Sequence, residues 1–485
     1  MTNLFHSTMQ NLLRRVKRAP ALLCLLILAV IQPLPARAVS IQDERELGER
    51  LLVLIRKEFK LIDEPDISTY IRALGNEVLE VAGPQPFSYQ FFVINNREFN
   101  AFAAPSGLVF IHSGLIEASD SEGELLSVMA HEVGHAVSRH YADRTDKMQR
   151  INLGATALAL AGMILGGGSA LGEAVVAGSL AGGATAALQF SRQDEEEADR
   201  LALKWMHEMG REPAEMLGML RKMRNISRFR RAQLPPYLLT HPEPEQRLSY
   251  IEDRLHMEGL STRPQPRLSD ADFEFQFHRV RQRIFALTRS PQELLPALEH
   301  RLRGGDDAPE IFMARFGLSQ VYLAERQYDK AIAEINKVID RFPRQTILLA
   351  DLAIIQFEAG RHETALGNMA QAIKREPDNP YILFHLARFY QQLGQLKAAL
   401  PIYERLLTMT PDHSRLHFRY GQARSDLGDR AAGHYHLGLY HWYEGDARMA
   451  SHHLNEAIRL DPANEEGTIG QMARTQLATI ARLGK

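Results

Sequence analysis

Cysteine and net charge are what this sequence has least of. The 485 residues contain one cysteine, Cys24, which lies in an N-terminal segment that we expect to be removed. The remaining chain then has no thiol for a disulfide, a nucleophile or a cysteine zinc site. Lys and Arg number 57 against 59 Asp and Glu. A chain without excess positive charge is a poor candidate for binding nucleic-acid phosphates, so we expect no nucleic-acid partner.

Long hydrophobic runs are also scarce, and the first of them predicts a signal peptide. A basic run at 14–18 precedes an apolar run at 19–31, and Ala36-Arg37-Ala38 supplies the small residues of a cleavage site. The apolar run is short for crossing a bilayer, although an uncleaved anchor is the alternative. Removal of residues 1–38 takes away five basic residues and changes the net charge from −2 to −7. We expect export to a bacterial periplasm, with the mature chain beginning near Val39.

Composition indicates a folded protein of two or three domains. Hydrophobic residues make up 45% of the chain and charged residues 24%, which excludes global disorder. Residues 41–255 are mostly helical in pattern, with amphipathic stretches at 44–59 and 67–81. Residues 87–95 and 108–112 have the character of strands and predict a small sheet made largely of hairpins.

Two further segments have the composition of connections. Residues 100–107, between the two strand-like segments, are rich in small residues and turn-prone. Residues 259–269 hold two prolines and few large apolar side chains, as a linker does.

An internal repeat of 34 residues occupies the C-terminal part. Prolines recur at this spacing, and each has an alanine twelve residues before it: Ala331 with Pro343, Ala365 with Pro377, and Ala399 with Pro411. Ala297 with Pro309 and Ala450 with Pro462 extend the pattern, and Gly360, Gly394, Gly428 and Gly445 follow the same period or its half. The pattern resembles the tetratricopeptide repeat over 275–475, with a small residue where two helices cross and a proline where the second ends. Helical hairpins of coincidental length are the alternative.

One predicted helix, 121–141, carries the sequence His131-Glu132-Val133-Gly134-His135. Histidines four residues apart lie on one helical face, so two imidazoles can bind one zinc ion. Glu132 is then placed to take a proton from water at the metal and to pass it to a leaving amine. Two solvated histidines on a surface helix are the alternative, but the flanking apolar positions favour a buried helix.

The third zinc ligand must come from another helix. Ser138 and Tyr141 stand where an extended histidine motif would continue, so that extension is absent. A second helical run begins at 191–199, where Glu195 and Asp199 are four residues apart. One carboxylate can bind zinc while the other accepts a hydrogen bond from a ligand histidine. An acidic, exposed first helical turn is the alternative.

His-Glu-x-x-His followed by Ser-Arg-x-x-Glu-x-x-Ala-Asp resembles the gluzincin zinc metallopeptidases of the HtpX and CAAX-prenyl-protease type, here joined to tetratricopeptide repeats. The resemblance implies one Zn2+ per chain bound by His131, His135 and Glu195, with Glu132 as the catalytic base and Asp199 supporting a ligand. Segment 100–115 resembles the part of these enzymes that leads to an edge strand, which binds extended substrate.

A loop at 240–247 contains two further candidates, His241 and Arg247. In the simpler interpretation, His241 and Pro242 only begin a helix. The resemblance implies that His241 can occupy the fourth coordination position and hold the enzyme latent. Arg247 is expected to orient this loop or to stabilise the oxyanion.

The segment 151–189 is rich in Gly and Ala and has one charged residue, Glu173. We expect an apolar hairpin that acts as a lid or plug beside the active site. Membrane contact through this segment is the alternative, because the uncharged run 151–172 is nominally long enough to cross a bilayer.

These observations predict a mainly α fold: an α+β metallopeptidase domain with a small sheet, then an α-solenoid. The expected domains are a signal peptide at 1–38, a zinc metallopeptidase at 39–258, a linker at 259–274, repeats at 275–475 and a tail at 476–485. The resemblance implies a periplasmic endopeptidase that cleaves unfolded or stalled outer-membrane proteins, with repeats that bind substrates or the β-barrel assembly machinery. A chaperone-like repeat scaffold with a latent protease is one alternative, and a membrane-embedded prenyl-type protease is a weaker one.

Overall fold

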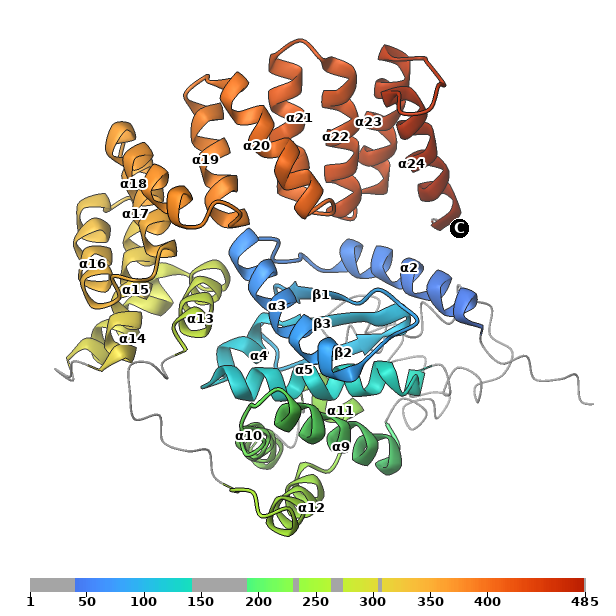
Figure 1. The fold of residues 1–485 in the computed structure, drawn as a ribbon, viewed down its shortest axis with the longest axis vertical. Coiled ribbons are helices and arrows are strands. Elements are labelled where there is room, and N and C mark those ends of the chain that lie inside the picture. The colour runs from blue at the N-terminus through green and yellow to red at the C-terminus, as the bar shows by residue number, and fades with distance from the viewer. Residues whose placement is uncertain (1–39, 142–189, 230–234, 263–273, 304–307, 484–485) are drawn as a thin grey trace, which may run out of the picture.

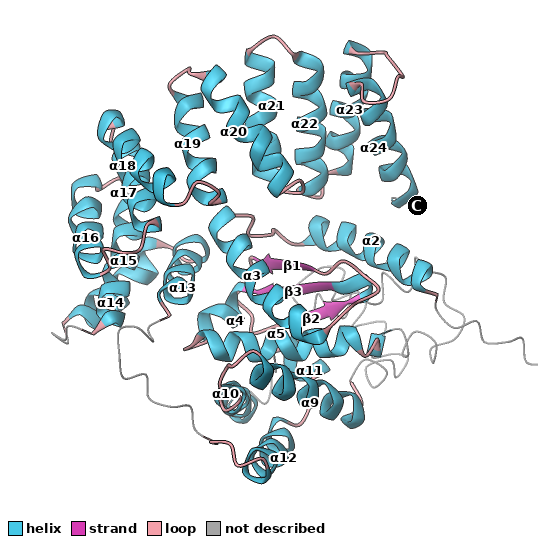
Figure 2. Ribbon diagram, viewed as in Figure 1, coloured by secondary structure: helices cyan, strands magenta, loops and turns pink. Residues whose placement is uncertain are grey.

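The computed structural model describes residues 40–141, 190–229, 235–262, 274–303 and 308–483 (Figure 1). Helices dominate these ranges, and one small sheet lies among the N-terminal helices (Figure 2). The prediction of a mainly α fold is confirmed. No helix within these ranges is long and apolar enough to cross a membrane. The predicted signal peptide and the Gly/Ala-rich segment 151–189 lie outside the described residues.

The N-terminal part packs helices around a three-stranded sheet. The strands are β1 (Gln90–Ile94), β2 (Ala101–Ala104) and β3 (Leu108–His112), in the order β1-β3-β2. The helices are α2 (Ile41–Glu58), α3 (Pro65–Ala82), α4 (Ser113–Ala118), α5 (Glu122–Val137), α9 (Arg192–Glu208), α10 (Glu215–Phe229), α11 (Pro236–Thr240) and α12 (Pro244–Met257). Apolar side chains from α3, α5, α9, α10 and the sheet form the main core.

The sheet differs from the predicted set of hairpins. Only β2 and β3 form a hairpin, whereas β1 runs parallel to β3, with Gln90 opposite Leu108. The turn-prone segment 100–107 contains strand β2, in which every residue is buried. Alanine has little intrinsic preference for strands, so this strand forms because it packs between β3 and α5. As the last strand in the order, β2 has one edge that pairs with no other strand of the described residues.

The C-terminal part is a succession of antiparallel helix pairs from α13 to α24, which in Figure 1 rises along the left side and then crosses the top from left to right. Its helices are α13 (Phe275–Thr288), α14 (Pro291–Leu302), α15 (Pro309–Ala324), α16 (Tyr328–Arg341), α17 (Ile347–Glu358), α18 (His362–Arg375), α19 (Pro380–Gln392), α20 (Leu396–Met409), α21 (Ser414–Asp426), α22 (Arg430–Tyr443), α23 (Ala447–Leu460) and α24 (Ile469–Leu483).

The repeat signature has the expected structural roles in most copies. Its alanines are fully buried where neighbouring helices cross: Ala331, Ala365, Ala399 and Ala450. Gly360 and Gly394 end helices with φ of 76° and 73°, a conformation that costs little only for glycine. Ala297 departs from the pattern, because it is exposed on α14, where Leu294 and Leu298 are buried instead. Pro309 begins α15 rather than following a helix.

The repeats pack against the N-terminal part through α3 and α13. Arg279 on α13 is fully buried and donates hydrogen bonds to Asp351 on α17, at 2.8 and 2.6 Å, and to Asp66 on α3, at 2.8 Å. Tyr381 on α19 donates to the same Asp351. The buried guanidinium of Arg279 therefore joins α13 and α17 to α3, the helix beside β1.

Candidate metal centre

Helix α5 carries both motif histidines into the interior. Its first turn is capped by the side chain of Ser121, which accepts a hydrogen bond from the Glu124 N–H. All residues from Gly123 to His135 are buried, and His131 and His135 are only 1% and 0% exposed. The alternative of two solvated histidines on a surface helix is therefore wrong.

Helix α9 crosses α5 closely enough to bring its carboxylates to the histidines. The crossing lies at Gly134, where an added Cβ would come within 3.2 Å of the Ala198 backbone. Ser191 and Asp194 form a capping box that starts α9, and Glu195 and Asp199 follow on its buried face, at 2% and 0% exposure. The alternative of an exposed acidic turn is wrong for these two residues.

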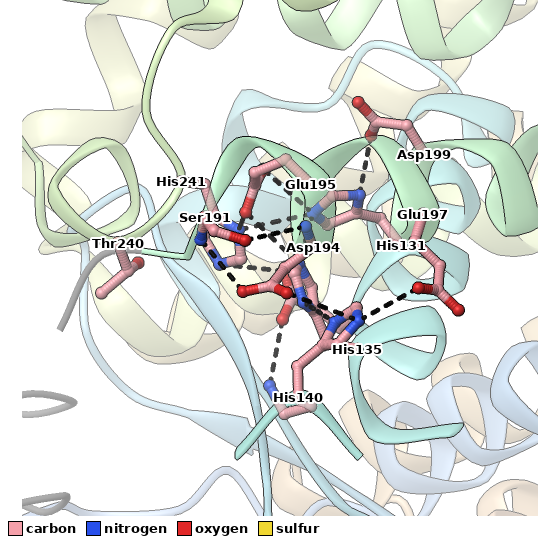
Figure 3. A network of polar contacts seen from close by, with 12 residues as sticks. His131, His135, His140, Ser191, Asp194, Glu195, Glu197, Asp199, Thr240 and His241 are labelled. Atoms are coloured by element: carbon pink, nitrogen blue, oxygen red, sulfur yellow. Dashed lines mark hydrogen bonds and ion pairs between the residues drawn. The ribbon is translucent and has the colours of Figure 1, made fainter. Parts of the chain in front are cut away.

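The side chains of His131, His135, Glu195 and His241 point toward one another (Figure 3). The Nε2 atoms of His131 and His135 are 3.0 Å apart. Glu195 Oε1 lies 3.4 Å from His135 Nε2, and Glu195 Oε2 lies 3.6 Å from His131 Nε2. His241 Nδ1 completes the group at 3.4 Å from His131 Nε2 and 2.9 Å from Glu195 Oε1.

This group of atoms fits a zinc ion. Tetrahedral zinc with ligands at about 2.0–2.1 Å requires ligand atoms roughly 3.3 Å from one another, close to the spacings found here. His241 Nε2 and Glu132 Oε1 are buried and have no hydrogen-bond partner among the described residues. Three imidazole nitrogens and a carboxylate converge here in the interior of the protein, and such an arrangement is costly unless a cation binds it.

Three polar groups orient the ligand side chains from behind. Asp199 Oδ1 lies 2.8 Å from His131 Nδ1, and Asp199 also accepts a hydrogen bond from the Tyr250 hydroxyl. His140 Nδ1 lies 2.8 Å from His135 Nδ1. Contacts of this kind hold a ligand imidazole in one tautomer and direct its other nitrogen at the metal.

Arg247 on α12 binds the carboxylates of this centre. Its guanidinium donates to both oxygens of Asp199, at 2.8 and 2.6 Å, and Nη1 lies 2.8 Å from Glu195 Oε2. Arg247 is 4% exposed, and the two carboxylates balance its buried charge.

Burial and charge shift the pKa values in the direction that metal binding requires. Burial lowers the pKa of His135 well below its ordinary value, so the ring is neutral. Burial alone would raise the pKa of Glu195, but its neighbours His241 and Arg247 lower it well below its usual range. The pKa of Asp199, which burial would also raise, is lowered to about 2 by Arg247 and His131. Neutral imidazoles and ionised carboxylates are the forms that bind metal ions.

Glu132 lies between the ligand group and the edge strand. The N–H of Ala103 on β2 donates a 3.0 Å hydrogen bond to Glu132 Oε2. The other oxygen, Oε1, lies 3.5 Å from His241 Nε2. This arrangement fixes the carboxylate beside the ligand group and beside the open edge of the sheet.

His241 belongs to the turn between α11 and α12. Its N–H donates to the Tyr237 carbonyl, and the Tyr237 ring stacks on the imidazole with centroids 4.3 Å apart. Glu243, with φ of 62°, then redirects the chain into α12. The simpler interpretation, in which His241 only begins a helix, is wrong, because the ring is 1% exposed and lies among the ligand atoms.

Sequence reasoning missed His140, Phe190, Tyr237 and Tyr250. Phe190 stacks on His135 with centroids 3.8 Å apart. These residues have no motif spacing to the ligands, and only Tyr250 offered a signal: it lies three residues after Arg247, on the same face of α12.

Comparison with known families divides the chain into two parts. The model of peptidase family M48 matches residues 65–255. Tetratricopeptide-repeat models match residues 294–346, 356–424 and 431–464. These matches confirm the resemblance to a zinc metallopeptidase joined to tetratricopeptide repeats.

Curated proteins with similar sequences carry protease names. The chain is 31% identical over 301 residues to a beta-barrel assembly-enhancing protease of Yersinia pestis, which covers 60% of this chain and 59% of that protein. It is 30% identical over 308 residues to the protein of the same name in Escherichia coli K12, covering 63% and 61%. A mitochondrial metalloendopeptidase OMA1 of Schizosaccharomyces pombe is 27% identical over 224 residues, covering 45% and 62%. The matched regions thus span about three-fifths of each relative.

Proposed function

The chain contains a peptidase family M48 domain followed by tetratricopeptide repeats, and we propose on this premise that it is a zinc-dependent endopeptidase. The observation that carries the proposal is the buried group of His131, His135 and Glu195, with a carboxylate, Glu132, beside it. A zinc ion held by these three side chains would lower the pKa of water and polarise a peptide carbonyl.

Glu132 acts as the base and then as the acid. Its Oε2 is held by the Ala103 N–H, which leaves Oε1 to accept a proton from the attacking water. The same oxygen then gives this proton to the leaving amine, so that the carboxylate is restored at the end of the cycle.

Strand β2 binds the substrate backbone. It is an edge strand, and its Ala103 is joined directly to Glu132. A peptide that adds to this edge in extended conformation places its carbonyl groups in line with the catalytic carboxylate. Such backbone binding favours unfolded chains, because a folded protein offers no free extended segment.

His241 holds the resting enzyme in a latent state. Its imidazole lies where a fourth ligand would be and is close to both Glu195 and Glu132. Substrate carbonyl and water need the same space. The turn between α11 and α12 must therefore move His241 away before hydrolysis.

The protein acts in the periplasm on misfolded or stalled outer-membrane proteins, in their assembly and quality control. The names of the Yersinia and Escherichia relatives support this role. The repeats bind substrates or the β-barrel assembly machinery, since stacked helix pairs form extended protein-binding surfaces. A chaperone-like scaffold with a latent protease is the second candidate, which the position of His241 favours.

Replacing Glu132 by Gln tests the catalytic assignment. The variant keeps the shape and the Ala103 contact but cannot accept a proton. We expect casein cleavage to fall by about a thousandfold or more, with zinc content unchanged by metal analysis. Retained cleavage with retained zinc would reject Glu132 as the base.

The same variant separates the two candidate functions in cells. An endopeptidase role predicts that Glu132→Gln fails to restore outer-membrane protein assembly in a strain lacking the gene. Full restoration would assign the essential role to the repeats as a scaffold.

A further inference from the structure

A cavity lies between the protease part and the repeats, away from the metal centre. It has a volume of about 740 Å³, within the range of ligand-binding pockets. Its walls are the end of α2, strand β1 with the start of α3, the turn that precedes α21, and the C-terminal end of α22. In Figure 1, β1 is the strand nearest the repeats, whereas β2 lies toward α5. The cavity is therefore at the sheet edge opposite the proposed catalytic edge.

Arg56, near the end of α2, lines this cavity without an anionic partner. It is 9% exposed, and no carboxylate of a described residue lies within ion-pair distance of its guanidinium. Its Nε is buried and has no hydrogen-bond acceptor in the described structure. The rings of Tyr443 and Phe92 lie against it, with centroids 4.8 and 5.8 Å from Cζ. A buried guanidinium without an acceptor is costly, so this position favours an added carboxylate.

The carboxylates of Asp412, Asp63 and Glu444 act on Arg56 at longer range, but none of them forms an ion pair with it. Lys57, Lys60 and Arg72 also line it, and no ion pair joins any of them to a described residue. Of the acidic residues in the wall, Asp63 accepts hydrogen bonds from the N–H and hydroxyl of Ser414, and Glu444 accepts from the same hydroxyl. Glu58 and Asp412 are the remaining acids.

The outer edge of β1 has free backbone groups beside Arg56. Further along this edge, the backbone groups are already paired. The Val93 carbonyl accepts a hydrogen bond from the Ile62 N–H at 2.8 Å, and the Lys60 carbonyl accepts one from the Asn95 N–H at 2.9 Å. Alternate residues of a strand direct their backbone groups to the same side, so Phe91 also presents its N–H and carbonyl to this edge. Neither group is hydrogen-bonded to a described residue on this side, and the Phe91 ring packs on Gly75 in the core.

We propose that this cavity binds an extended polypeptide segment that carries a carboxylate. The segment adds to β1 at Phe91 by backbone hydrogen bonds, and its carboxylate binds the Arg56 guanidinium. A free strand edge next to an unpaired buried cation matches an extended peptide better than a small anion, which would leave the edge unused. The carboxylate belongs either to an acidic side chain or to a chain terminus.

Fluorescence anisotropy with designed peptides tests this proposal on the full chain, in the Glu132→Gln variant so that the probe stays intact. The first probe is fluorescein-labelled Thr-Thr-Val-Thr-Glu-Thr-Val-Thr-Lys with an amidated C-terminus. The second replaces its Glu by Gln, and the third is the Gln peptide with a free C-terminus. We expect the Glu peptide to bind about tenfold more tightly than the amidated Gln peptide. Tight binding of the third probe would identify a chain terminus as the preferred source of the carboxylate.

Two substitutions locate the binding. Arg56→Gln should remove the preference for the Glu peptide, and Arg56→Lys should restore part of it. Thr69→Trp, on the cavity wall, should weaken all three probes by filling the space. Glu49→Gln is the matched control, because it breaks another contact of α2 with the repeats, to Arg482, outside the cavity. It should leave binding unchanged.

Three results would overturn the proposal. Equal affinity for all three peptides would remove the role of the carboxylate. Binding that neither Arg56→Gln nor Thr69→Trp changes would place the peptide elsewhere. Complete displacement by millimolar inorganic phosphate would show a small-anion site instead of a polypeptide site.

Discussion

At the scale of single residues, the metal centre depends on which atom of each side chain faces inward. His131 directs Nε2 to the centre because Asp199 binds its Nδ1 at 2.8 Å. Asp199 in turn accepts hydrogen bonds from Arg247 and Tyr250. The orientation of one ligand ring is thus set by a carboxylate that never reaches the centre itself.

Replacing Asp199 by Asn should weaken zinc binding without removing a ligand. An Asn amide has one oxygen where Asp has two. If its NH2 group faces Arg247, two donors oppose each other, and if the NH2 group faces His131, the acceptor for His131 Nδ1 is lost. We expect zinc affinity to fall by about 10–100-fold, measured by competition with a chromogenic chelator. Glu196→Gln, an exposed change three residues earlier, is the control and should leave affinity unchanged. Equal affinities for both variants would contradict the orienting role.

Removing the His241 imidazole should increase activity if this ring blocks the resting enzyme. His241→Ala leaves three ligands in place and frees the fourth position. We expect casein cleavage to rise by about tenfold, which corresponds to about 1.4 kcal/mol of competition from the ring. Zinc content should stay the same, and a fall in cleavage would instead make His241 part of the catalytic machinery.

At the scale of elements, the crossing of α5 and α9 assembles the centre. Gly134 lets the Ala198 backbone approach α5 closely. The ligand side chains of the two helices therefore meet, as Figure 3 shows for His131, His135 and Glu195. The glycine inside the histidine motif therefore has a packing role that is distinct from the chemistry of its neighbours.

Enlarging Gly134 should separate the two helices. Gly134→Val introduces branched carbon atoms where even a Cβ would lie 3.2 Å from Ala198. We expect unfolding stability to fall by about 1–3 kcal/mol, together with loss of zinc. Gly367→Ala on α18 is the control: nothing lies within 4 Å of its added Cβ, so helix propensity should raise stability slightly. Denaturant unfolding and metal analysis of both variants distinguish packing from a general effect of losing glycine.

At the scale of the whole molecule, the protease part and the repeats meet at buried charge. Arg279, Asp66 and Asp351 are all buried and come from α13, α3 and α17. Burial alone would raise the pKa of Asp66, but Arg283 and Arg279 lower it below its ordinary value. Asp66 is therefore ionised, and both carboxylates accept hydrogen bonds from this guanidinium.

Arg279→Met should weaken the joint between the two parts. The substitution leaves the carboxylates of Asp66 and Asp351 buried with less positive charge to balance them. We therefore expect the free energy of unfolding, measured with denaturant, to fall by about 3–5 kcal/mol. Arg361→Ala removes an exposed ion pair with Asp329 and should change stability by no more than about 0.5 kcal/mol. Equal effects of the two substitutions would show that the buried group contributes no more than a surface pair.

Sequence reasoning reached the parts of this molecule that depend on spacing along the chain. Four-residue spacing placed His131 and His135 on one face of α5, and Glu195 and Asp199 on one face of α9. The period of 34 residues identified the repeats, whose alanines are buried at helix crossings. The same reasoning took segment 100–107 as a turn, because propensity is a weak guide where a strand forms by packing.

The sequence by itself determined the two helical motifs and the repeat, because each is a relation between residues one or a few turns apart. Only the tertiary structure decided that β1 is parallel to β3, that His140 and Tyr250 support the ligands, and that Arg56 lies unpaired beside a free strand edge. These relations join residues far apart in the chain, and their proximity follows from the packing of the whole molecule.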